Sequence, residues 1–457
     1  MFEGQLEDGP HLVSAPVRSL ENIWQAELKH QPFPVFTAEE PAERKRQLEL
    51  GLTFAEAGAP CWLLLNPDSL RLKKLPDDWD GPVARRDHKG SMYGYRDELQ
   101  ERLLNVSWKT FTIDEFHKTG LNSTLSLFRL GAGLVEAERR YGLSGTPMGG
   151  KPIRLFQPLQ WIEPKLFGSM WRWADDWLVI DDNGFGKTIG AMQPGREQQF
   201  YKAHARHMVR RLKREALPGL PAKLINVVMC KMTPKQRKVY KRFARDAEVR
   251  IEGGRVTATN LLSEYSRLKQ FANALCEVNE DGEVTPTTES GKLDQLLQKL
   301  DEHGIRKADP EPGARAIIAS ESKRMVVMVT DWLNSKGIYA DMLTGDTKDS
   351  RPIISRFQDY DDDCLMVLVM TTQTGGVSLN LERADSVHVL DESWNPDDQL
   401  QLEDRADRGS RTTPLVVYRY RSIGTIQDYI AEVNADKEIN NANIMDIHRK
   451  LVKGKLT

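Results

Sequence analysis

The 457-residue sequence contains only four cysteines, and they form no recognisable motif. Cys61, Cys230, Cys276 and Cys364 are scattered, and no two of them have metal-ligand spacing. This usage argues against a cysteine zinc site and a disulfide framework, and it indicates a reducing, intracellular compartment. The first residues, MFEGQLEDGPHL, are acidic where a signal peptide is basic and then apolar.

Long apolar runs and an excess of one charge are missing as well. No run approaches the roughly 20 apolar residues that span a bilayer, so we expect no membrane function. The formal net charge is −2, which means that any nucleic-acid surface has to be local. Basic runs occur at 205–214, 235–245 and 448–455, and each is also compatible with an ordinary solvated helix face. There is no internal repeat.

Two buried strands and a polar helix face are predicted within 366–411. The apolar run 366–370 has the length of a parallel strand, and glycine turns at strand ends are where α/β sheets bind ligands. This strand ends in Thr371, Thr372, Gly375 and Gly376.

After a second strand at 386–390, Gln401, Arg405 and Arg408 follow i, i+4, i+7 spacing, which predicts one helix face. Two guanidinium groups on one face suit a phosphate that gains charge during transfer. The alternative is a solvated face whose arginines pair with Glu403 and Asp404.

A carboxylate pair follows another predicted strand. The alternating segment 109–113 is followed directly by Asp114 and Glu115, and His117 comes two residues later. Such a pair can hold Mg²⁺, usually through water, and polarise an attacking water. Taken alone, a DExH sequence such as DEFH is common by chance and is more often a solvated turn. A Ser-Gly-Thr-Pro turn containing Ser144 and Thr146 comes about 28 residues later.

Taken in order, these segments resemble the Swi/Snf-related branch of the superfamily-two helicases. The resemblance covers nearly the whole chain and rests on HLVSAP with W-x-x-E at 11–27, DEFH at 114–117, SGTP at 144–147, TGDT with R and F at 344–357, TTQTGGVSLNL at 371–381, and WNP with Q-x-x-x-R-x-x-R at 394–408.

The resemblance implies a role for each matched residue. Asp114 would serve Mg²⁺, Glu115 would be the general base, and His117 would relay to the other lobe. Gln401, Arg405 and Arg408 would face ATP across a cleft, with Arg408 as the arginine finger. The residues expected to couple nucleotide to DNA are Ser144, Thr146, Arg351, Thr371, Thr372, Gly375 and Gly376.

The implied architecture is α/β, with two RecA-like parallel-sheet lobes and a helical insertion between them. We expect a first lobe at 1–160, incomplete at its N-terminus, and a helical insertion and linker at 161–275. The second lobe, the helicase C-terminal domain, should cover 276–435, with a helical tail at 436–457.

A phosphate-binding loop is the missing part of this pattern. The family has it before the first motif found here, so the first lobe is expected to be truncated. The segment DNGFGKT at 182–188 imitates such a loop, but Gly190 and Pro194-Gly195 interrupt the helix that Lys187 would need. We therefore expect these residues alone to hydrolyse ATP poorly.

The predicted function is ATP- and Mg²⁺-dependent translocation on double-stranded or branched DNA. Such movement could serve remodelling, annealing or branch migration. Alternatives are a strand-separating helicase and a non-catalytic DNA-binding fragment or subunit. The compact chain resembles the forms encoded by phages or bacteria. We expect an intracellular protein that is cytoplasmic or nucleoid-associated. The sequence identifies no protein partner.

Overall fold

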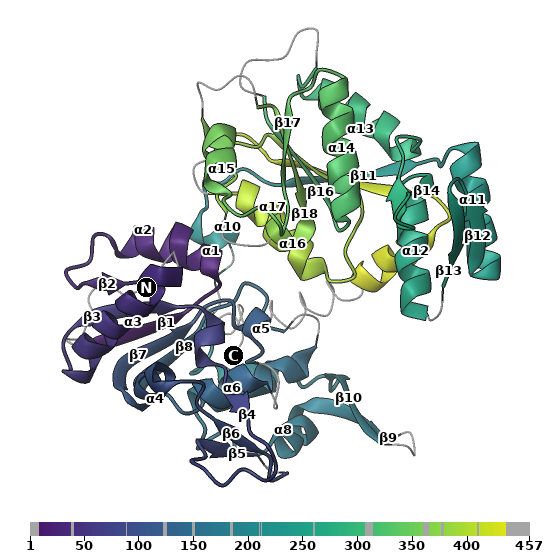
Figure 1. Cartoon of the computed structure of the whole chain (residues 1–457). Coiled ribbons are helices and arrows are strands. Elements are labelled where there is room, and N and C mark those ends of the chain that lie inside the picture. Colours follow the sequence, from purple (N-terminus) through teal and green to yellow (C-terminus); the bar gives the residue numbers. More distant parts are fainter. Residues whose placement is uncertain are drawn as a thin grey trace. The chain divides into compact units, whose positions relative to one another are not determined.

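The computed structural model describes residues 9–37, 41–87, 89–121, 126–148, 151–182, 186–209, 211, 213–258, 261–306, 314–359, 365–375, 379–408 and 411–435. The chain divides into two compact units, whose elements are labelled in Figure 1. Among the described residues, unit 1 covers 9–209 and unit 2 covers 211–435. No helix in these ranges combines the length and apolarity needed to cross a bilayer.

Unit 1 is built on a parallel sheet in the order β2-β3-β1-β7-β8. Its inner strands are buried apolar runs, as expected for a sheet that is covered on both faces. One face packs on α3 and α4, and the other packs on the segment from α1 to α2. The elements are β1 (Pro10–Ser14), α1 (Val17–Ser19), the π-helical η1 (Leu20–Trp24), α2 (Gln25–Leu28), β2 (Val35–Phe36), α3 (Pro41–Glu56), β3 (Cys61–Leu65), η2 (Pro67–Leu70), α4 (Glu98–Asn105), β7 (Ser107–Ile113), α5 (Phe116–Thr119), α6 (Leu127–Ala132) and β8 (Glu136–Gly142).

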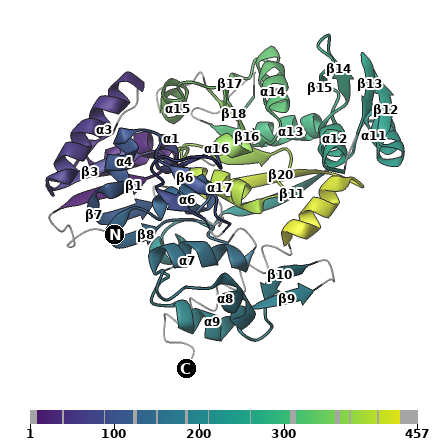
Figure 2. The ribbon, with the colours of Figure 1, turned by 60° about the horizontal axis from the view of Figure 1, so that its bottom comes forward.

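Unit 1 also carries a small antiparallel sheet and a separate helical cluster with its own aromatic core. A β-hairpin extends from this cluster, as Figures 1 and 2 show. The elements are β4 (Lys73–Lys74), β5 (Arg85–Arg86), β6 (Met92–Gly94), η3 (Pro152–Leu155), α7 (Phe156–Ile162), α8 (Met170–Trp177), β9 (Leu178–Asp182), β10 (Lys187–Met192) and α9 (Glu197–His204).

Unit 2 contains a six-stranded parallel sheet in the order β11-β20-β19-β16-β18-β17. Successive residues of β16 point to opposite faces: Ile318 packs with α13 and α14, and Ile317 packs with α15 and α17. The elements are α10 (Lys213–Ala216), β11 (Leu224–Cys230), α13 (Gly291–Glu302), β16 (Ala316–Ser320), α14 (Lys323–Ser335), β17 (Ala340–Leu343), α15 (Arg351–Gln358), β18 (Val367–Thr371), α16 (Thr372–Gly375), β19 (Ser386–Val389), α17 (Pro396–Ala406) and β20 (Val416–Ser422), followed by a helical segment at 426–435.

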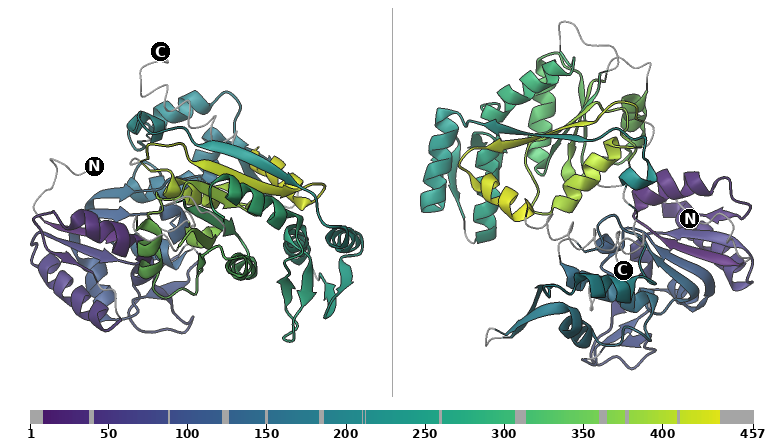
Figure 3. Two further views of the ribbon diagram at one scale, coloured as in Figure 1. Left: turned by 90° about the horizontal axis from the view of Figure 1, so that it is seen from above. Right: turned by 180° about the vertical axis from the view of Figure 1, so that it is seen from behind.

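A small subdomain lies at one end of unit 2, on the side away from α15 (Figures 2 and 3). Two helices and two hairpins enclose a separate core that includes Tyr240, Phe243 and Phe271. We call it the α11 subdomain. Its elements are α11 (Pro234–Asp246), β12 (Glu248–Ile251), β13 (Gly254–Thr257), α12 (Leu261–Asn273), β14 (Cys276–Val278) and β15 (Val284–Pro286).

The parallel sheet predicted for each lobe is confirmed, but the division of the chain differs from the predicted one. The boundary between the two compact units falls between residues 210 and 211 of the chain, inside the expected insertion 161–275. That segment is not simply helical, because it contains β9, β10, β11, β12 and β13. It is not a separate layer either, since β11 pairs in parallel with β20 and extends the sheet of unit 2. The expected tail at 436–457 lies outside the described residues.

Lys292 joins three parts of unit 2 through one buried ammonium group. The residue stands in the first turn of α13 and is fully buried. Its Nζ donates to Asn273 Oδ1 at 2.9 Å, to the Tyr420 carbonyl oxygen at 3.1 Å and to the Leu390 carbonyl oxygen. These acceptors belong to the end of α12, to β20 and to the residue after β19. Burial lowers the pKa of Lys292 to about 8.

Replacing Lys292 by methionine should lower the free energy of unfolding of unit 2 by roughly 2–4 kcal/mol, because buried acceptors lose their donor. The variant Lys299→Met, which loses a partly exposed pair with Glu302, should cost under about 1 kcal/mol. Denaturant unfolding of both variants measures the difference.

The pH dependence of Lys292 provides a second readout. Since its folded pKa lies near 8 and its ordinary value is 10.5, the unfolded state binds more protons between these values. This group therefore makes stability rise with pH in that window, and Lys292→Met should lose the rise. An unchanged profile would contradict the buried ammonium assignment.

Candidate catalytic site

The strands β1, β7 and β8 bring three chain segments to one edge of the unit 1 sheet. The Asp114 N–H donates to the Ser14 carbonyl oxygen at 2.9 Å, and the Leu143 N–H donates to the Ile113 carbonyl oxygen at 2.8 Å. Parallel strands end at the same edge, so the loop after β7 lies beside the loop after β8. The DEFH segment and the Ser144–Thr146 turn are therefore neighbours.

Asp114 is held by three donors. Its Oδ2 accepts hydrogen bonds from Ser19 Oγ at 2.9 Å and from Trp24 Nε1 at 3.1 Å, and its Oδ1 accepts from the Glu115 N–H at 2.9 Å. Ser19 and Trp24 belong to the segment after β1, where α1 passes into a π-helical turn. Single π-helical turns are frequent at functional sites. Trp24 is the first residue of the W-x-x-E motif, and its role as a donor to Asp114 was not predicted.

The carboxylate of Asp114 fits a water-mediated contact with Mg²⁺. One hydrogen bond to Oδ1 leaves that oxygen with acceptor capacity. Among the residues that the structure describes, no three or more His, Cys, Asp or Glu side chains form a metal cluster. In proteins, Mg²⁺ usually retains several waters and is bound by one or two carboxylates together with substrate phosphates. A single carboxylate such as that of Asp114 therefore fits Mg²⁺, and a full set of protein ligands is not required.

Glu115 has a left-handed backbone conformation with φ 48° and ψ 44°. For a residue other than glycine this conformation is uncommon and costs about 1–3 kcal/mol, and such strain gathers at functional sites. Its Oε2 lies 3.3 Å from His117 Nδ1, and both side chains are largely buried. The strained backbone therefore directs the carboxylate toward the histidine.

His117 connects the carboxylates to the second loop. Its Nδ1 lies 2.8 Å from Ser144 Oγ, its Nε2 lies 3.5 Å from Thr146 Oγ1, and the Thr146 N–H donates to Ser144 Oγ at 3.1 Å. Burial, with additional effects of Lys118 and Arg154, lowers the pKa of His117 to about 4. The imidazole is thus neutral at pH 7. Asp114, Glu115, His117, Ser144 and Thr146 form one connected cluster, and the roles assigned to them by resemblance stay predictions.

Two predicted motifs of unit 2 also contact each other. The Leu381 N–H donates to the Arg405 carbonyl oxygen at 3.2 Å, and Arg408 Nη2 donates to the Leu379 carbonyl oxygen at 3.1 Å. The end of the 371–381 segment is therefore attached to α17 and to the residues after it. Gln401 is buried in α17.

The prediction that Arg408 shares a helix face with Gln401 and Arg405 was wrong. The helix ends at Ala406, and Asp407 leaves the helical conformation with φ −91° and ψ 79°. Arg408 therefore reaches Leu379 from the loop that follows α17. The i+7 spacing from Gln401 assumed that the helix continues to residue 408, but the helix ends two residues before it.

The predicted coupling residues lie at the carboxyl end of β18 and at the start of α15. Thr371 Oγ1 donates to Thr374 Oγ1 at 2.6 Å, Thr372 is buried, and Gly375 ends α16. Arg351 begins α15 and pairs with Asp349 at 3.0 Å. Gly376 lies outside the described residues.

Glu403 fixes α17 from its buried side. The carboxylate is fully buried and pairs with Lys223 Nζ at 2.7 Å and with Arg419 Nη2 at 3.0 Å. Burial alone would raise the pKa of Glu403, but these cations lower it below its ordinary value. Asp404 pairs with Lys213 at 2.8 Å. The solvated-face alternative, in which Glu403 and Asp404 pair with the motif arginines, does not fit these partners.

The DNGFGKT segment forms no phosphate-binding loop in the part that the structure describes. Lys187 and Thr188 begin β10, where they pair with Asp182 and Asp181 of β9 in an antiparallel hairpin. A phosphate loop needs its lysine at the start of a helix whose N–H groups face the phosphates. Lys187 lies in a strand instead.

Comparison with known proteins supplies two family matches. Residues 68–277 match the model of the SNF2-related domain, and residues 291–410 match that of the helicase conserved C-terminal domain. The chain is 26% identical over 358 residues to the SWI/SNF chromatin-remodeling complex subunit snf22 of Schizosaccharomyces pombe, with 72% of this chain and 20% of that protein covered.

Two further relatives extend this similarity. The transcription regulatory protein SNF2 of Saccharomyces cerevisiae is 28% identical over 366 residues, covering 73% of this chain and 20% of that protein. The probable ATP-dependent DNA helicase CHR23 of Arabidopsis thaliana is 27% identical over 344 residues, covering 72% and 31%. The chain thus spans less than a third of the length of these relatives. All three are eukaryotic, so a phage or bacterial source stays a prediction.

The low pKa of His117 predicts an acid-sensitive site. Between pH 6.5, its ordinary value, and about pH 4, the unfolded state binds more protons than the folded state, so stability is lost as pH falls through this window. Wild type should lose roughly 2.5 kcal/mol more than His117→Asn between pH 7 and pH 4.5. Urea unfolding of unit 1 at both pH values measures this difference, with the exposed His30→Asn as control. Equal losses in wild type and His117→Asn would contradict it.

Proposed function

The chain belongs to the Swi/Snf-related branch of the superfamily-two helicases and translocases, and on that premise we propose that it couples ATP hydrolysis to movement on, or remodelling of, double-stranded DNA. The observation that carries the proposal is the connected cluster of Asp114, Glu115, His117, Ser144 and Thr146. The SNF2-related match includes all five residues.

In this proposal Glu115 is the general base that orients and deprotonates the attacking water. Its Oε2 lies 3.3 Å from Nδ1 of His117, whose imidazole is neutral at pH 7. Asp114 would hold Mg²⁺ through water, and the ion would supply charge stabilisation at the phosphates. Hydrogen bonds from Ser19 and Trp24 keep the Asp114 carboxylate in one orientation for that task.

His117 would transmit the state of this cluster to the loop after β8. Its Nδ1 lies near both Glu115 Oε2 and Ser144 Oγ, and its Nε2 lies near Thr146 Oγ1. A shift of Glu115 during hydrolysis would therefore change the position of the Ser144–Thr146 turn. This link gives a physical route from chemistry to a DNA-contacting loop.

Residues of unit 2 would serve the same reaction. Gln401, Arg405 and Arg408 would stabilise the charge that develops on the transferred phosphoryl group, with Arg408 as the arginine finger. The contacts of Arg405 and Arg408 with residues 379–381 support a second coupling route, because that segment continues from Thr371 and Thr372. By its motif, Arg351 belongs to the residues that would couple nucleotide to DNA.

The alternative function is DNA binding without turnover. This alternative is motivated by the lack of a recognisable phosphate-binding loop. DNGFGKT resembles such a loop in sequence, but Lys187 and Thr188 pair with Asp182 and Asp181 in an antiparallel hairpin. Strand separation is a further activity that the same site could drive. In either case we place the protein where DNA is accessible, in the cytoplasm or at a nucleoid.

ATP hydrolysis with and without a DNA duplex tests the proposal. In Glu115→Gln, a DNA-stimulated rate should fall by at least about 100-fold, because a positioned general base contributes roughly 10²–10⁴-fold. Lys187→Ala and the surface variant Glu138→Gln should retain the wild-type rate.

The outcomes separate the two functions. A rate that survives Glu115→Gln would contradict the assignment of the base. Wild-type chain that binds duplex DNA but hydrolyses no ATP would favour the non-catalytic alternative. A rate lost in Lys187→Ala would show that the hairpin rearranges into a phosphate loop.

A further inference from the structure

We propose that the exposed basic face of α11, with the adjoining hairpin β12–β13, binds the phosphate backbone of a DNA duplex independently of ATP. We call these residues the α11 basic face: Arg237, Lys238, Lys241, Arg242, Arg245, Arg250 and Arg255. The inference goes beyond the proposed function, because it assigns a second DNA contact outside both motif clusters.

The helix α11 separates its charges from its core-facing side. Gln236, Tyr240 and Phe243 are buried, and the first of them caps the helix start through its bond to Thr233. The helix PKQRKVYKRFARD contains six basic residues and one acidic residue, although the whole chain has a net charge of −2. At about 100° per residue, all six basic positions fall on the half opposite the buried one.

Most of this charge is not neutralised locally. Arg245 pairs with its neighbour Asp246, and Lys235 lies 3.6 Å from Glu289. Within the described part of the chain, Arg237, Lys238, Lys241 and Arg242 form no ion pair. All four are exposed. An unpaired cluster of this size repels itself, and an anionic partner would relieve the repulsion.

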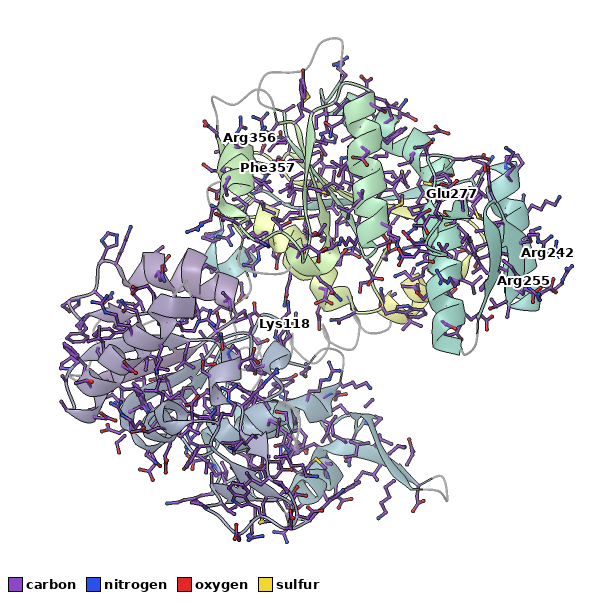
Figure 4. All side chains as sticks on the ribbon, viewed as in Figure 1. Lys118, Arg242, Arg255, Glu277, Arg356 and Phe357 are labelled. Carbon is purple, nitrogen blue, oxygen red and sulfur yellow. The ribbon has the colours of Figure 1, made fainter. Side chains whose placement is uncertain are left out.

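The hairpin places two more like charges side by side. Arg250 and Arg255 are direct cross-strand partners, whereas the preceding pair, Val249 and Val256, is buried in the subdomain core. Like charges directly opposite each other destabilise a strand pair. Glu248 pairs with Arg255 and offsets part of this cost. In Figure 4, Arg242 of α11 and Arg255 of β13 both lie at the outer end of the subdomain.

The position of nearby carboxylates decides where an anion can lie. Lys235, Lys238, Arg242 and Arg250 line a groove whose other lining residues include Glu252, Glu277 and Glu289. These carboxylates disfavour a phosphate inside the groove. The outer ridge of α11, with Arg237, Lys241 and Arg245, is more favourable.

The chemistry of the ridge favours a duplex over a single strand. Proteins that bind single strands combine a basic groove with aromatic side chains on which bases stack. Both aromatic residues of α11, Tyr240 and Phe243, are buried. Long, flexible basic side chains on a convex helix contact phosphates without reading bases, which suits the backbone of double-stranded DNA. A helix of this length covers about 20 Å.

Salt-dependent DNA binding by the full chain tests the proposal. Fluorescence anisotropy with a 20-base-pair duplex, without nucleotide, compares wild type with the combined variant Arg237→Gln, Lys238→Gln, Lys241→Gln and Arg242→Gln. Each lost phosphate contact should reduce the slope of log affinity against log salt by about 0.9, so the slope should weaken by roughly 2–4 and affinity should fall at least about tenfold near 0.1 M salt.

A charge-matched control separates this surface from a general loss of positive charge. The combined variant Arg44→Gln, Lys45→Gln, Lys73→Gln and Lys74→Gln removes four exposed basic groups from unit 1 and should change the slope by less than one. Equal effects of both variants, an unchanged slope, or equal affinity for a single-stranded 20-mer would overturn the inference, as would wild-type chain without duplex binding. Unaltered thermal midpoints exclude misfolding as the cause. ATP hydrolysis, measured separately, tests the proposed function alone.

Discussion

The register between β1 and β7 determines the catalytic cluster of unit 1. Ser14 and Ile113 are paired at the ends of these strands, and the next N–H, that of Asp114, donates to the Ser14 carbonyl oxygen. The chain leaving β1 then turns back with Ser19 and Trp24, whose donors reach the Asp114 carboxylate. A slip of one residue would reverse the direction of every side chain on the strand and separate this carboxylate from its donors.

A comparable constraint acts on α17 of unit 2 through buried charge. Glu403 has no exposed surface, so its carboxylate is stable only while Lys223 and Arg419 remain paired with it. Removing one partner of a buried ion pair costs about 3–5 kcal/mol. These cations come from the segment before β11 and from β20, and they therefore fix the helix that carries Gln401 and Arg405. The orientation of these side chains depends on strands that the motif itself does not include.

Local patterns in the sequence predicted the strands and the order of the motifs well. The apolar run 366–370 and the alternating segment before Asp114 form the expected strands because burial and pleat impose their periods directly. Asp114 and Ser144 lie in neighbouring loops because β7 and β8 end at the same edge of the sheet, and β8 was not among the predicted strands. The partners that hold these groups were not predictable, since Trp24 and Lys223 are 90 and 180 residues from their acceptors.

Helix ends and imitated motifs were the other limits of prediction. Arg408 keeps helical spacing in the sequence, yet the helix already ends at Ala406, three residues before the nearest following glycine, Gly409. The DNGFGKT segment has the residues of a phosphate loop, but Val179, Ile180 and Ile189 on either side favour strands, and strand pairing decides the outcome.

The near-zero net charge conceals how differently the cations of this chain are used. Lys223, Lys269 and Lys292 are committed to buried or largely buried acceptors, so they cannot contribute to binding a nucleic acid. Basic residues on α11 are exposed and mostly unpaired. The net charge counts the buried, paired lysines and the exposed basic residues of α11 in the same way. Only cations without local partners can exchange counterions for phosphates, and among the described residues α11 presents four of them on one helix face: Arg237, Lys238, Lys241 and Arg242.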